Sequence, residues 1–236
     1  MSCKTGWGAR LGSDGLCCPI VEIVSPSDIM AFSHVASQSV RGMMIYADAE
    51  IRDESYLLMI LMLTLQVPNL KQLDVFFDGI FHEAHTLEDK AMHAFINVLE
   101  RAIRNASDLH SLDLCLGNYI SFASHQKLFG SLLIHRRLIR LSMENVSVAC
   151  SASTTAWKLL GTTVSSLPHL RELRLANIED FSPKCLAKLC QALRENGVLE
   201  TLALINADMA EAHMHVLVEH VPLLQSLESL DLQGND

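Results

Sequence analysis

The feature that most constrains the fold is a short leucine pattern, Leu-x-x-Leu-x-Leu, which recurs along most of the chain. One copy begins at Leu170 and continues through Leu173 and Leu175, with Arg174 between the last two leucines. In a β-strand, residues two apart lie on the same face, and the residue between them faces the other way. The pattern therefore predicts a short strand with one leucine face to bury and one open face.

The pattern occurs in seven copies with a nearly constant spacing. The copies are Val40-Met43-Ile45, Leu70-Leu73-Val75, Leu109-Leu112-Leu114, Leu138-Leu141-Met143, Leu170-Leu173-Leu175, Leu199-Leu202-Leu204 and Leu227-Leu230-Leu232. Their first positions, residues 40, 70, 109, 138, 170, 199 and 227, are separated by 30, 39, 29, 32, 29 and 28 residues. A single copy is common in helices, but five steps of 28–32 residues indicate a structural repeat.

From Val40 to the C-terminus, the repeats resemble leucine-rich repeats of the long form found in the ribonuclease-inhibitor-like class. This resemblance implies an α/β solenoid in the shape of a horseshoe, with a concave parallel β-sheet and convex helices. Physical reasoning favours the same layout, because a short strand cannot bury its leucines without neighbouring coils. Each segment between copies is also long enough for the crossover that parallel strands require.

Asparagines stand near the end of several repeats. The ladder asparagine of the family, ninth from the first leucine, is present as Asn235, whereas Asn145, Asn177 and Asn206 stand one residue earlier in their copies. We expect these side chains to hydrogen bond backbone groups where each strand ends and the chain turns. The shift by one residue leaves the geometry of those turns open.

Apolar periodicity between the copies predicts helices at residues 53–66, 86–105, 125–134, 154–164, 183–194 and 209–219. The step from Leu70 to Leu109 is 39 residues against the usual 28–32, and we assign the surplus to a loop at residues 77–85. Its apolar side chains, Phe77 and Phe81, either pack beneath the loop or form an exposed patch that binds a partner.

The two ends of the chain differ from the repeats. We divide the chain into an N-terminal tail with a capping helix (1–39) and a domain of about seven leucine-rich repeats (40–236). Residues 1–19 have no predicted regular structure, and a strand is predicted at 20–24. Residues 25–37 resemble the second half of an F-box, which implies docking onto a ubiquitin-ligase adaptor; the alternative is a helix that only caps the solenoid. The last copy leaves no room for a polar cap, so we expect either a fragment truncated at its C-terminus or an open end.

Composition excludes several classes of protein. The net charge of −9 argues against nonspecific binding to nucleic acid or to an anionic membrane. The seven cysteines include no Cys-x-x-Cys pair, which predicts reduced thiols rather than a zinc site or a disulfide framework. The N-terminus lacks the apolar run of a signal peptide, and the most apolar window, residues 57–65, is shorter than the ~20 residues of a membrane helix. The predicted location is therefore the cytoplasm.

No motif in the chain indicates catalysis. His82 and His85 flank Glu83, but their i, i+3 spacing in a loop differs from the i, i+4 spacing of a metalloprotease helix. Three further histidines are interpreted as surface or packing residues: His213, His215 and His220. We therefore expect no enzymatic activity, no cofactor, no metal and no small-molecule substrate.

The residues between the buried leucines are expected to form columns on the concave sheet. The central column is Met44, Asp74, Asp113, Ser142, Arg174, Ala203 and Asp231. The candidate partner-binding residues are Asp74, Phe76, Asp113, Glu144 and Arg174 on this face, together with Phe77 and Phe81. The predicted function is a non-catalytic module that binds a protein partner through the concave face or the loop at 77–85. The alternative is a substrate-recognition subunit of a ubiquitin ligase.

Overall fold

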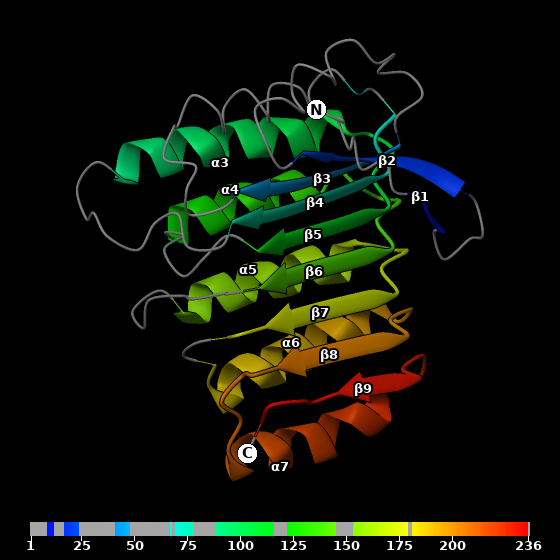
Figure 1. Ribbon diagram of the computed structural model, residues 1–236. Helices are drawn as coiled ribbons and strands as arrows, with labels where there is room; N and C mark the ends of the chain where they lie inside the picture. Colours follow the sequence, from blue (N-terminus) through cyan, green and yellow to red (C-terminus); the bar gives the residue numbers. More distant parts are fainter. Residues whose placement is uncertain are drawn as a thin grey trace.

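The chain forms an α/β fold built on one open sheet (Figure 1). The computed structural model describes residues 9–11, 17–23, 41–47, 67, 69–77, 88–115, 122–144, 153–178 and 181–235. Its nine strands are β1 (Ala9–Leu11), β2 (Cys17–Ile23), β3 (Gly42–Ala47), β4 (Gln72–Phe77), β5 (Ser111–Cys115), β6 (Arg140–Glu144), β7 (Glu172–Ala176), β8 (Thr201–Ile205) and β9 (Ser229–Asp231). They lie side by side in sequence order; β2 to β9 are parallel, and β1 is antiparallel to β2.

The described helices lie between successive strands and gather on one side of the sheet (Figure 1). They are α3 (Glu88–Asn105), α4 (Phe122–Leu132), α5 (Ser153–Ser166), α6 (Pro183–Asn196), α7 (Glu211–His220) and the short 3-10 helix η2 (Val221–Leu223). This alternation of one strand and one helix in sequence order is compatible with a solenoid, because each coil packs mainly against the next.

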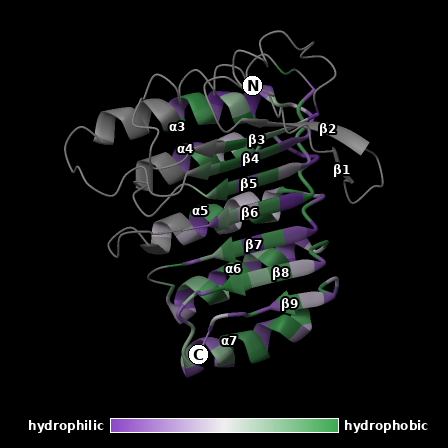
Figure 2. Cartoon of the chain, viewed as in Figure 1, coloured by the Kyte–Doolittle hydropathy of each residue, from purple (hydrophilic) through white to green (hydrophobic). Residues whose placement is uncertain are grey.

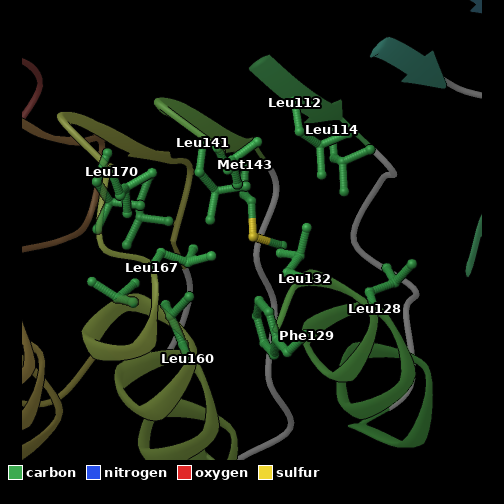
Figure 3. Close-up of a cluster of buried hydrophobic side chains, with 14 of the residues drawn as sticks. Leu112, Leu114, Leu128, Phe129, Leu132, Leu141, Met143, Leu160, Leu167 and Leu170 are labelled. Atoms are coloured by element: carbon green, nitrogen blue, oxygen red, sulfur yellow. The ribbon is translucent and has the colours of Figure 1, made fainter. Parts of the chain in front are cut away.

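The hydrophobic core lies between the sheet and the helices. Leu112, Leu141, Leu173 and Leu202 are successive partners across β5 to β8, and each is at most 1% exposed. Figure 3 shows Leu112 and Met143 directed from their strands toward Leu132 of α4. Figure 2 shows hydrophilic residues where the strands begin and hydrophobic residues along their middle. Each apolar position of the leucine pattern therefore forms a continuous row of buried side chains that crosses the neighbouring strands.

Helix α6 shows why the helices begin and end where they do. The Ser182 hydroxyl accepts a hydrogen bond from the Cys185 amide at 3.4 Å, and Pro183 occupies the first turn, where a missing N–H costs nothing. At the other end Gly197 adopts φ = 72°, a left-handed conformation that favours glycine, and its N–H donates to the Leu193 carbonyl at 3.1 Å.

The strand predictions for the seven copies are confirmed, since β3 to β9 each contain the second leucine-type position of one copy. The helices predicted at 86–105, 125–134, 154–164, 183–194 and 209–219 are confirmed with boundaries shifted by up to three residues. The helix predicted at 53–66 and the capping helix predicted before residue 40 lie outside the described residues. The prediction of no regular structure in residues 1–19 was wrong: β1 and the first part of β2 lie there, because the two segments pair with each other.

The described asparagines at these turns divide into two kinds, and Asn145 lies outside the described residues. The Asn235 amide nitrogen donates to the carbonyls of Leu204 and Leu232 at 2.7 and 2.8 Å, which confirms that this side chain satisfies backbone groups at the turn. Asn177 and Asn206 instead adopt φ of 50° and 48°, and Asn206 Nδ2 donates to Asn177 Oδ1 at 2.9 Å. Asparagine tolerates this left-handed conformation better than most residues. The shift by one residue thus accompanies a left-handed turn.

Candidate functional site: the open face of the sheet

The candidate site lies on the face of β4 to β8 opposite the described helices. Side chains alternate along a strand, so residues between the buried leucines lie on this second face. The register places Asp74 beside Asp113, Asp113 beside Ser142, and Ser142 beside Arg174. The central column predicted from the sequence is therefore confirmed residue by residue.

Two ion pairs occupy the β6 and β7 part of this face. Arg174 Nη1 lies 3.4 Å from Glu144 Oε2, and Arg140 Nε lies 3.7 Å from Glu172 Oε2. The Asn177 amide also donates to Glu144 Oε1 at 3.0 Å. These side chains are partly exposed, so each pair contributes less than about 1 kcal/mol to folding. The positive charges of these two arginines are nevertheless matched within this pair of strands.

The β4 and β5 part of the face is acidic. Asp74 is only 5% exposed, and its Oδ2 accepts a hydrogen bond of 2.6 Å from Gln72 Nε2. Asp113 is half-buried, and its Oδ1 is buried without a hydrogen-bond partner. None of the ion pairs among the described residues includes Asp113. The two halves of the open face thus differ in charge balance.

Ser142 is not among the predicted binding residues, although it lies at the centre of the column. It is 0% exposed, and its Oγ has no hydrogen-bond partner. The alternation of the strand predicts its position, but a serine on an open face is ordinarily solvated, and its burial depends on the longer side chains around it. The sequence carries no signal of that burial.

The remaining candidates are distributed unevenly. Phe76 lies on the open face and is half-buried, next to the buried Cys115 of β5. Phe77 is the last residue of β4, and its side chain lies outside what the structure describes. Phe81 and the rest of the loop at 78–85 also lie outside the described residues. The structure therefore brings together five of the seven predicted residues: Asp74, Phe76, Asp113, Glu144 and Arg174.

The other described parts of the molecule offer no comparable chemical site. Among the described residues, no group of three or more histidine, cysteine or carboxylate side chains is arranged to hold a metal ion. Grooves of about 390 and 210 Å³ lie between α5 and α6 and beside η2, away from the candidate residues. His213 is buried and packs at a turn, where its Nδ1 accepts a hydrogen bond of 3.1 Å from the Ala210 amide.

Comparison with known proteins gives no relative on which to base a function. No protein-family model matches the sequence, and no curated protein matches it either. Within the part of the chain that the structure describes, no helix combines the length and the apolar character needed to cross a membrane. A function must therefore be argued from the open face itself.

Proposed function

We propose that this chain is a non-catalytic protein-binding module of the leucine-rich-repeat class, and that it binds its partner through the open face of β4 to β8. The repeat spacing, the strands in sequence order and the helices on one side of the sheet support this class. In such a horseshoe the open face would be the concave one.

The observation that carries the proposal is the one-sided cover of the sheet. Parallel sheets are commonly covered on both faces by helices. Here the described helices lie on one side, and the other side presents Asp113, Glu144 and Arg174 in neighbouring strands. A wide, rigid face with aligned polar side chains can bind an extended protein surface, because its side chains are positioned before the partner arrives.

Site-specific photo-crosslinking tests which face binds. The photoreactive residue p-benzoylphenylalanine is placed at Arg140 or Thr201 on the open face and, as the matched control, at the exposed Gln191 on α6. Crosslinked partner protein is expected from the two open-face positions and not from Gln191. Crosslinks from Gln191 alone would contradict the proposal.

The loop at 77–85 stays a second predicted surface. Replacing Phe77 and Phe81 with serine distinguishes the two, since lost binding with an unchanged melting temperature would place the interface in this loop. A large drop in melting temperature would instead show that the two phenylalanines pack beneath it.

The ubiquitin-ligase alternative also stays a prediction. It requires the resemblance of residues 25–37 to an F-box to extend to function, and those residues lie outside the described part of the chain. Affinity purification followed by mass spectrometry tests it, because recovery of a ubiquitin-ligase adaptor would favour this alternative. Imaging of a fluorescently tagged chain tests the proposed cytoplasmic location.

A further inference from the structure

Two carboxylates stand directly beside each other on the open face. Asp74 and Asp113 are partners across β4 and β5, with their side chains on the same side of the sheet. Like charges in directly opposed positions destabilise a sheet. Asp74 has the Gln72 amide as a hydrogen-bond donor, whereas Asp113 Oδ1 is buried without one. The unpartnered Asp113 oxygen therefore lies beside a second carboxylate.

Ser142 adds a second buried oxygen without a partner. It is the neighbour of Asp113 in β6, it is 0% exposed, and its Oγ makes no hydrogen bond. A buried polar group without a hydrogen bond is unfavourable, and native structures contain few of them. The unpartnered oxygens of Asp113 and Ser142 therefore lie side by side on adjacent strands of the open face. Hydrogen-bond donors of another molecule can satisfy both of them.

The positive charges nearest in the column are already engaged. Arg174, the next residue after Ser142 in the column, lies 3.4 Å from Glu144, which lies farther along β6. The ion pairs of the described residues leave Asp113 without a cation. An external cationic donor would complement the charge of Asp113 and the two unfilled hydrogen bonds.

We propose that Asp113 and Ser142, with Asp74 adding negative charge, form a subsite for a lysine or arginine side chain of the partner protein. Adjacent strands lie about 4.8 Å apart, so one ammonium or guanidinium group can donate to both oxygens. Asp113 is half-buried as a residue, but its Oδ1 and Ser142 Oγ are covered, so the partner's cationic group reaches them only when the side chains above them move aside. This subsite rests on the proposed function, since it names the chemistry of the partner that the open face binds.

A peptide-library experiment tests the subsite while the partner itself is unidentified. The full chain is passed over resin-bound random heptapeptides with a fixed central lysine, arginine, norleucine or glutamate. Lysine and arginine libraries are expected to retain about tenfold more protein than the norleucine library. Asp113→Asn should abolish this preference. The matched control, Asp231→Asn, makes the same charge change in the same column on β9 and should keep it.

Thermal unfolding of the same variants separates binding from folding. Asp113→Asn and Ser142→Ala are expected to leave the melting temperature unchanged or to raise it. The first removes a negative charge beside Asp74, and the second removes a buried hydroxyl that has no hydrogen bond. A melting temperature lowered by several degrees in Asp113→Asn would show that the carboxylate serves folding and would overturn the subsite. Equal retention by the lysine and norleucine libraries, or a preference that survives in Asp113→Asn, would overturn it as well.

The photo-crosslinking experiment distinguishes failure of the subsite from failure of the proposed function. Crosslinks from Arg140 and Thr201 without any preference for lysine or arginine would leave protein binding by the open face standing and overturn the subsite alone. Absence of crosslinks from both positions would remove the subsite and the proposed interface together.

Discussion

Two neighbouring coils, each made of a helix and the strand that follows it, have the same sequence pattern but different surroundings. One contains α6 and the next contains α7. In α6, Leu186 is 0% exposed and Cys190 is 1% exposed. The positions 28 residues later, in α7, are Met214 and Val218, which are 43% and 73% exposed. Helix α6 packs against both α5 and α7, whereas α7 has a helical neighbour on one side only among the described helices.

The strands of these coils differ in the same way. Leu202 of β8 lies between β7 and β9 and is 0% exposed, whereas Leu230 of β9 pairs with β8 alone and is 37% exposed. The leucine pattern thus determines which side chains face inward. The neighbouring coils determine how much each of these side chains contributes to stability.

The largest expected effect comes from removing equivalent leucines in the two environments. Leu173→Ala in β7 should lower the free energy of unfolding by about 2–5 kcal/mol, because it leaves a cavity between the buried side chains of Leu141 and Leu202. Leu230→Ala in β9 should cost less than about 1 kcal/mol, and Arg174→Ala on the open face less than about 0.5 kcal/mol. Chemical denaturation measures all three, and equal losses for the two leucines would refute the comparison.

Amide hydrogen exchange sharpens the comparison without mutation. The Leu230 amide is expected to exchange about a hundredfold faster than the Leu173 amide, because local opening of β9 disrupts the packing of only one neighbouring strand. Mass spectrometry or NMR measures the rates. Protection as strong at Leu230 as at Leu173 would mean that β9 unfolds only with the rest of the sheet.

A smaller effect is weak self-association through the exposed apolar residues of α7 and the edge of β9. Residues 195–236 contain eight acidic residues and no lysine or arginine, so two such ends repel each other. Association should therefore strengthen as sodium chloride is raised from about 50 to about 500 mM, because salt screens the repulsion.

Sedimentation measures this association. Val218→Glu should weaken it, and Thr162→Glu, on the exposed side of α5, should not. A monomer at every salt concentration would contradict the prediction.

The smallest expected effect is on the pH dependence of stability. It is tested by comparing His135, which is buried, with His215 in the last coil. His135 is 1% exposed, and burial lowers the pKa of its ring below the ordinary 6.5. The positive charge of Arg104 lowers this pKa further, and the Ile103 backbone raises it in part. As the pH falls below about 6.5, the unfolded chain binds a proton at His135 before the folded chain does, so the free energy of unfolding decreases.

His135→Leu should reduce the loss of stability between about pH 7 and about pH 5. His215→Leu, in the last coil and with a 79% exposed side chain, serves as the matched control. Urea denaturation at the two pH values decides, and an identical pH dependence in the wild type and His135→Leu would contradict the prediction.

Much of the fold could be predicted because the leucine pattern has two independent periods. The spacing within each copy assigned the faces of the strands, and the spacing between copies assigned their order. The start of α6 at Pro183 was predicted, because the backbone preference of proline is local, whereas its end was predicted at residue 194 and lies at Asn196. Strand β1 was missed because its conformation depends on pairing with β2 rather than on its own apolar pattern.

The candidate site was predictable only in position. Alternation placed Asp74 and Asp113 side by side, since that result needs only the strand register. The burial of Ser142 and the unpartnered Asp113 Oδ1 depend on how longer neighbouring side chains are arranged, which a pattern of residue types does not encode.

Cys190 in α6 has a chemical consequence of its own. Burial raises the pKa of this thiol to about 11, so roughly one thiol in ten thousand is ionised at neutral pH. Because the thiolate is the reactive form, a thiol-specific reagent in water should modify Cys190 only after α6 has moved away from its neighbours. The rate of that modification would then report how often α6 opens, without any substitution in the chain.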